Sequence, residues 1–192
     1  MAAKGIFCLE GLWDHDLKNR FSVQPLLTML EINQKVKYIR QDAATIEELE
    51  FYLTLWKKSR YKNYPILYLA FHGESETLLI GKQLYTLERL SEHLAQSCMH
   101  SIIMIASCST LRTNRENLKN FLKTTNALAL CGYRAKVNWI HAAAFELMLL
   151  SSLQQIDFSG RGIRTFERQA SIYGERFNDL EFTFITRREI TH

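Results

Sequence analysis

The chain is poor in the residues that interrupt regular structure, since its 192 residues include only two prolines and eight glycines. Long disordered or low-complexity stretches are therefore not expected, because such stretches are usually rich in these residues. A chain of this length can bury one sizeable core but is short for two domains with a linker. We therefore expect a single domain over residues 1–192.

The sequence also lacks a hydrophobic run long enough to cross a membrane. The apolar run near its start, Gly5 to Leu9, is too short for the core of a signal peptide. The four cysteines include no CxxC pair, which fits reduced thiols in a reducing compartment. These features predict a cytoplasmic protein without a membrane partner.

Cofactor and metal motifs are missing as well. The sequence contains neither GxGxxG nor GxxxxGK[ST], and neither HExxH nor paired CxxC. A nucleotide cofactor and a metal ion are therefore not expected.

The net charge of +4 is mild, but arginines gather near the C-terminus. They are Arg161, Arg164, Arg168, Arg176, Arg187 and Arg188. Acidic residues such as Glu167 and Glu175 lie among them, a pattern typical of a solvated helix surface. Nucleic acid is therefore not an expected partner.

Apolar runs alternate with segments of helical period along the chain, which is typical of βαβ units. Strands are predicted at residues 5–12, 36–40, 66–71, 102–106, 127–133 and 181–186. Helices are predicted from about Ser22 to Ile32 and at 45–61, 86–96, 115–123, 137–153 and 161–180. We expect an α/β three-layer sandwich: a mostly parallel six-stranded sheet with helices on both faces and an antiparallel last strand. A small β-hairpin insert, turning near Gly81, should follow the third strand.

Two of the predicted strands end in a reactive residue. Residues 66–71 lead to His72-Gly73, and residues 102–106 lead to Ser107-Cys108. The carboxyl ends of parallel strands meet at one edge of a sheet, where ligands and reactive groups gather. A thiol beside an imidazole suits covalent catalysis, with the imidazole as base and then as acid. The backbone N–H groups of Gly73 and Cys108 are candidates for an oxyanion hole.

Each of these residues has a simpler interpretation when taken alone. A histidine at a strand end is often a hydrogen-bonded structural residue, and a cysteine in a strand usually only packs. The two together, in this order and with Gly73 after the histidine, favour a catalytic dyad of His72 and Cys108.

The chain resembles the caspase-like cysteine peptidases, and more closely the bacterial CHAT-type domains. The resemblance lies in Tyr68 to Gly73, Ile105 to Thr110, Cys131-Gly132-Tyr133, Val137-Asn138-Trp139 and Ala143-Ala144-Phe145-Glu146. It implies a caspase-like fold and a cysteine endopeptidase that hydrolyses peptide bonds with His72 and Cys108. It also implies a regulated bacterial effector with a peptide or protein substrate and a protein regulator. Because Cys108 lacks the Gln-Ala-Cys context of true caspases, aspartate specificity is not implied.

In such a fold, the loops after the first, fourth and fifth strands set specificity. The candidates for substrate binding are Asp14, Asp16, Ser109 and Arg134. An aspartate in the pocket for the first substrate side chain would favour a basic residue, and an arginine there an acidic one. The sequence leaves both open, with a slight preference for a basic residue.

Two other functions remain open at this stage. One is a catalytically silent caspase-like module that binds a protein through the strand-end crevice or through its basic C-terminal helix. The other is a different thiol chemistry on the same architecture, such as acyl or amide transfer to a small molecule.

Overall fold

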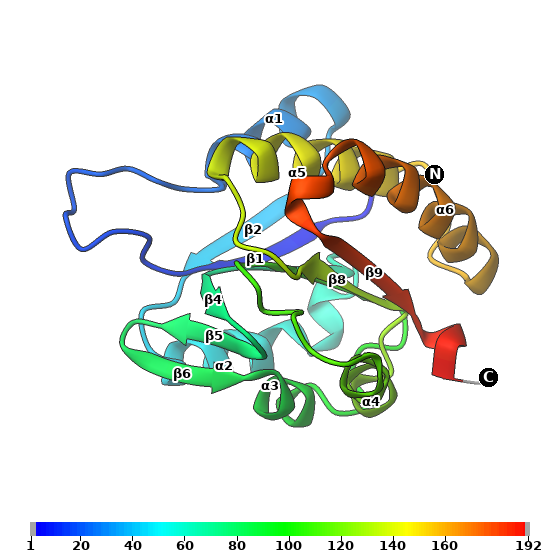
Figure 1. Cartoon of the computed structure of the whole chain (residues 1–192), viewed down its shortest axis with the longest axis horizontal. Helices are drawn as coiled ribbons and strands as arrows, with labels where there is room; N and C mark the ends of the chain where they lie inside the picture. Colours follow the sequence, from blue (N-terminus) through cyan, green and yellow to red (C-terminus); the bar gives the residue numbers. More distant parts are fainter. Residues whose placement is uncertain (1–2, 191–192) are drawn as a thin grey trace.

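The computed structural model describes residues 3–190 and has a six-stranded sheet at its centre (Figure 1). The strands are β1 (Ile6–Glu10), β2 (Tyr38–Asp42), β3 (Ile66–Ala70), β7 (Ile102–Ala106), β8 (Ala129–Tyr133) and β9 (Phe182–Thr186). They lie in the order β2-β1-β3-β7-β8-β9, and all neighbours are parallel except β8 and β9. The predicted mostly parallel sheet with an antiparallel last strand is therefore confirmed.

Helices cover both faces of this sheet, as the sequence predicts (Figure 1). The first face carries α1 (Gln24–Gln34), α5 (Trp139–Leu153) and α6 (Gly160–Arg176), and the second carries α2 (Ile46–Trp56), α3 (Leu87–His93) and α4 (Arg115–Thr125). Short 3-10 helices occupy Ser59–Tyr61 (η1), Asn178–Leu180 (η2) and Arg187–Ile190 (η3). No helix within residues 3–190 is both long and apolar enough to span a bilayer.

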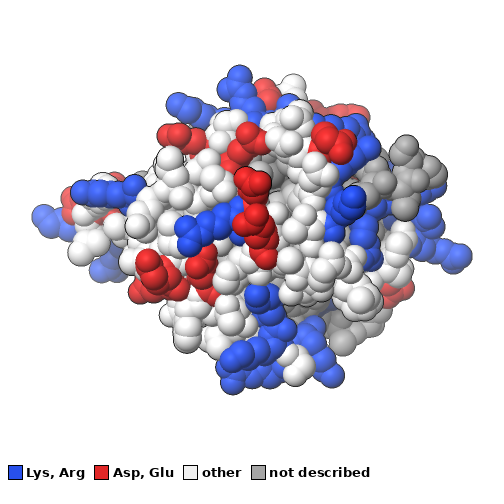
Figure 2. All heavy atoms as spheres, turned by 90° about the horizontal axis from the view of Figure 1, so that it is seen from below, with Lys and Arg blue, Asp and Glu red and all other residues white. Residues whose placement is uncertain are grey.

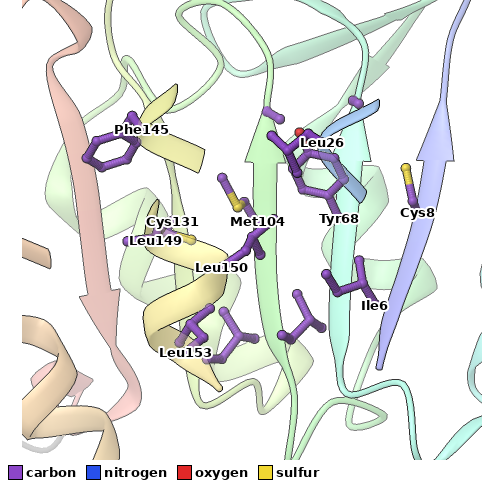
Figure 3. Close-up of a cluster of buried hydrophobic side chains, with 14 of the residues drawn as sticks. Ile6, Cys8, Leu26, Tyr68, Met104, Cys131, Phe145, Leu149, Leu150 and Leu153 are labelled. Carbon is purple, nitrogen blue, oxygen red and sulfur yellow. The ribbon is translucent and has the colours of Figure 1, made fainter. Parts of the chain in front are cut away.

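The alternating side chains of the buried strands build two cores, one on each face of the sheet. Ile6, Cys8, Tyr68 and Met104 pack under α5 on the first face (Figure 3). Their neighbours along the same strands, such as Leu67 and Ile103, pack under the helices of the second face. The strands β1, β3, β7 and β8 are therefore buried on both sides, which explains the continuous hydrophobic runs in the sequence.

Two helix starts show how local sequence sets the fold. The capping box of α2 is present: Thr45 Oγ1 accepts from the N–H of Glu48, whose carboxylate accepts from the N–H of Thr45. The sequence predicts that the first helix begins at about Ser22, whereas α1 begins at Gln24 with Val23 as its N-cap residue. Ser22 instead donates to a buried carboxylate of Glu10, at 2.8 Å.

The insert after β3 is a three-stranded antiparallel sheet of β4 (His72–Glu74), β5 (Thr77–Ile80) and β6 (Gln83–Thr86). The predicted hairpin is β5 and β6, and it turns at Gly81 with a φ of 59°. The third strand, β4, was not predicted. It starts at His72, so this candidate residue after β3 belongs to the second, smaller sheet.

Candidate active site

The predicted dyad residues follow two neighbouring strands of the central sheet. Ala70 at the end of β3 pairs with Ala106 at the end of β7, and His72 and Cys108 each lie two residues further on. A Cβ atom placed on Gly73 would lie 2.1 Å from Thr110 Oγ1 and 2.8 Å from the carbonyl oxygen of Cys108. The His-Gly segment and the cysteine turn are therefore in direct contact, and only glycine fits at position 73.

The His72 ring is exposed, and its orientation is fixed by the loop after β1. Its Nε2 atom lies 2.8 Å from the carbonyl oxygen of Trp13, and its ring meets the Trp13 indole edge-on with centroids 5.2 Å apart. A carbonyl oxygen can only accept, so Nε2 carries the hydrogen and Nδ1 of the neutral ring is the proton acceptor. This arrangement gives the imidazole the tautomer that a general base needs.

Cys108 lies half-buried in the turn after β7. The next residue, Ser109, has a φ of 56°, in the left-handed region that costs a non-glycine residue about 1 kcal/mol. The N–H of Ser109 donates to the carbonyl of Ala135 at 2.9 Å, and the hydroxyls of Ser107 and Thr110 lie 2.9 Å apart. The turn is thus held firmly in a strained shape, as is common at functional sites.

The other three cysteines are buried and suited to packing. Burial raises the pKa of Cys98 to about 12 and also raises the pKa values of Cys8 and Cys131. A buried thiol of high pKa is a poor nucleophile, because the thiolate is the reactive form. Cys108 is therefore the chain's best candidate for a reactive thiol.

The segment that holds His72 is itself held by Glu10, the last residue of β1. The buried Glu10 carboxylate accepts from Trp13 Nε1 at 2.6 Å, from the N–H of Val23 at 2.8 Å and from Arg40 Nε at 2.5 Å. Sequence reasoning missed this role of Glu10. The available signal was a carboxylate that directly ends a buried apolar strand.

A second buried carboxylate lies under the sheet, on α5. Glu146 accepts hydrogen bonds from the hydroxyls of Tyr68 on β3 and Tyr133 on β8. Burial raises the pKa of Glu146 to about 7, although both tyrosine hydrogen bonds act in the opposite direction. The sequence singled out Glu146 only through the family resemblance.

The predicted substrate-binding residues occupy different places. Ser109 lies directly beside Cys108. Asp14 and Asp16 lie in the long loop between β1 and α1, which projects from the body of the molecule (Figure 1). The Asp14 carboxylate accepts from the N–H of Asp16 at 2.9 Å and from Asn19 Nδ2 at 2.7 Å, and these bonds lower the pKa of Asp14.

Asp14 and Arg134 line two different cavities. Asp14 lines one of about 200 Å³ together with Trp13, Phe21 and Asp42, so it adjoins the residue that orients His72. Arg134 lines another, of about 550 Å³, between α6, β9 and α4. The lining residues of this second cavity do not include His72 or Cys108. Among residues 3–190, no group of three histidine, cysteine, aspartate or glutamate side chains is arranged to hold a metal ion.

Comparison of the chain with protein-family models gives a match over most of its length. The model of a protein family, described as a family of unknown function (DUF6642), matches residues 3–160. The matched range runs from before β1 to the first residue of α6 and includes His72, Cys108 and Glu146. No curated protein matches the chain.

Proposed function

We propose that this chain, which belongs to the DUF6642 family, is a cysteine endopeptidase of the caspase-like, CHAT-type group, with His72 and Cys108 as its dyad. The hydrogen bond from His72 Nε2 to the Trp13 carbonyl is the observation that carries this proposal. This bond selects the tautomer in which the unprotonated Nδ1 can accept a proton, and the loop that carries Cys108 contacts the next residue, Gly73. The side chains of His72 and Cys108 are both accessible, as a peptidase requires.

The proposed reaction assigns a role to each residue of the edge. Nδ1 of His72 accepts the thiol proton of Cys108, and the thiolate attacks the carbonyl carbon of the scissile bond. The N–H groups of Gly73 and Cys108 stabilise the oxyanion that forms. His72 then donates its proton to the leaving amine, and a water molecule that it deprotonates hydrolyses the thioester.

The cavity beside Trp13 supports a preference for a basic substrate side chain. Asp14 and Asp42 line it, and the one basic lining residue, Arg40, already pairs with Asp42 and Glu10. A lysine or arginine side chain would meet the Asp14 carboxylate there. The resemblance alone supports a bacterial effector under a protein regulator, and the cysteine pattern supports a cytoplasmic location.

Activity-based labelling tests this proposal. Purified protein is incubated with biotinylated acyloxymethyl ketones that carry a basic, acidic or apolar first residue. We expect labelling that Cys108→Ala abolishes and His72→Ala strongly reduces, while Cys98→Ala and His100→Ala leave it unchanged. Labelling that survives in Cys108→Ala would refute the dyad. A folded wild-type protein that no probe labels would favour the silent protein-binding module.

A further inference from the structure

The opposite edge of the sheet, where the parallel strands begin, carries a concentration of positive charge. Residues 57–62, which follow α2 and lead to β3, read Lys-Lys-Ser-Arg-Tyr-Lys. The side chains of Lys58, Arg60 and Lys62 are exposed. In Figure 2, one group of basic side chains lies together at the lower edge of the face, while other basic side chains lie at its left and right margins.

A hollow lies within this basic segment. It has a volume of about 200 Å³ and lies between residues 56–65 and residues 97–101. Among the residues that the structure describes, its lining includes three lysines and His100 but no carboxylate. The lining also includes Tyr61, Tyr64 and three serines, so hydroxyl groups and aromatic edges lie beside the positive charges. The positive charges and hydroxyl groups fit a phosphate group rather than a cation, and Trp56, Pro65 and Met99 add apolar surface beside them.

The positive edge continues from this hollow toward β2. The N–H of Gly5 donates to the carbonyl of Asn63, and the N–H of Ile6 donates to the carbonyl of Lys37. The residues before β2 and β3 therefore lie on the same edge of the sheet, and Lys35 and Lys37 extend the exposed positive charge. Carboxylates on this side of the molecule include Glu31 on α1 and Asp157 after α5.

Helix stabilisation accounts for only part of this charge. Cations are favourable at helix C-termini, and Lys35 and Lys57 are the C-cap residues of α1 and α2. Lys57 also donates from Nζ to the carbonyl oxygen of His93, at the end of α3. Lys58, Arg60 and Lys62 lie beyond the last turn of α2. They form no ion pair with a carboxylate among residues 3–190.

We propose that this surface, made of residues 57–62, the adjoining hollow and Lys35 and Lys37, binds single-stranded nucleic acid. Phosphates would lie along the exposed cations, and the planar guanidinium of Arg60, which lies 4.9 Å from the centre of the Tyr61 ring, suits stacking with a base. The expectation against a nucleic-acid partner rests on the C-terminal arginines, which take no part in this surface. The five-residue strands place this edge about 16 Å from the dyad's edge, at about 3.3 Å per residue. The two sites are therefore separate, and binding does not depend on the proposed peptidase activity.

Fluorescence anisotropy with a labelled single-stranded RNA or DNA of about 12 nucleotides tests the proposal. The test variant is Lys58→Glu/Arg60→Glu. Its matched control is Lys18→Glu/Arg20→Glu, which makes the same charge change at the same spacing in the loop after β1. At about 50 mM salt we expect the test variant to bind at least about tenfold more weakly and the control to stay within about twofold of wild type. Thermal unfolding checks the fold, and Lys58→Gln/Arg60→Gln replaces the test variant if it is unstable.

The salt dependence gives a second readout. For single strands the logarithm of the binding constant falls with that of the salt concentration by about 0.7 per neutralised phosphate. The test variant should therefore have a slope shallower by about 1.4, for two lost contacts. Equal weakening in both variants would show a mere effect of net charge and would overturn the proposal. The proposal would also fail if the wild type bound only duplexes, anionic vesicles or an acidic peptide.

Discussion

The Nε2 atom of His72 lies 2.8 Å from the main-chain carbonyl oxygen of Trp13, which places two segments far apart in the sequence in one site. The Trp13 indole holds this carbonyl in place from two sides. It packs edge-on against Trp139, with ring centroids 4.8 Å apart, and donates to Glu10. The orientation of the proposed base therefore depends on the packing of one tryptophan.

Replacing Trp13 should impair the site more than the fold. Trp13→Ala removes the ring contacts and the bond to Glu10, which frees the carbonyl that orients His72. We expect the rate of Cys108 labelling to fall about 10- to 100-fold, a typical result of displacing a catalytic group by about 1 Å. Trp13→Phe keeps an aromatic ring and should lose less than Trp13→Ala. Wild-type labelling by a folded Trp13→Ala protein would contradict this role of the loop.

Gly73 should be irreplaceable for a steric reason. In Gly73→Ala the new methyl group would collide with Thr110 Oγ1 and with the Cys108 carbonyl, so the cysteine turn must move. We expect a loss of about 1–3 kcal/mol in unfolding free energy, as for other overpacked sites, together with a loss of labelling. Urea unfolding and probe labelling measure the two effects.

A matched glycine provides the control for this experiment. A Cβ atom on Gly174, within α6, would have no neighbouring atom within 4 Å. Gly174→Ala should therefore stabilise the protein by about 0.5–1 kcal/mol, because alanine favours the helix interior, and leave labelling unchanged. If Gly73→Ala were as stable and as reactive as Gly174→Ala, the close contact at Gly73 would not matter.

Much of the fold could be predicted because buried strands leave a direct mark in the sequence. The run Ile102–Ala106 is apolar throughout and is strand β7 with the predicted bounds. Strand β4 could not be recognised in this way, because His72-Gly73-Glu74 contains no apolar side chain. The contacts that hold the proposed dyad could not be predicted from the sequence either. The donors to Glu10 include Val23 and Arg40, and the group that orients His72 is a main-chain carbonyl, which every residue has.

Glu146 should make the stability of the protein depend on pH. Its pKa is about 7 in the folded protein, above its ordinary value of 4.5, because burial disfavours the charged form. The folded state therefore binds the proton more tightly, so this contribution to stability is fully present below pH 4.5 and is lost as the pH rises toward 7. Between about pH 5 and pH 8 the wild type should lose about 2–3 kcal/mol of unfolding free energy through this group.

Urea unfolding of Glu146→Gln at both pH values tests this prediction. The amide does not ionise. The unfolding free energy of Glu146→Gln should therefore fall less between these pH values than that of the wild type, by about 2 kcal/mol. The control Glu175→Gln changes an exposed carboxylate on α6. Its unfolding free energy should fall with pH as much as that of the wild type. An equal decline in wild type and Glu146→Gln would show that Glu146 does not titrate in this range.

Peptide hydrolysis itself tests the central claim most directly. A mixture of synthetic peptides with varied sequences is incubated with wild-type protein and with Cys108→Ala, and new termini are identified by mass spectrometry. The proposed dyad predicts cleavage by the wild type alone, with lysine or arginine enriched before the cut bond. The same cleavage by Cys108→Ala, or no cleavage by a wild type that the ketone probes do label, would contradict a peptidase centred on His72 and Cys108.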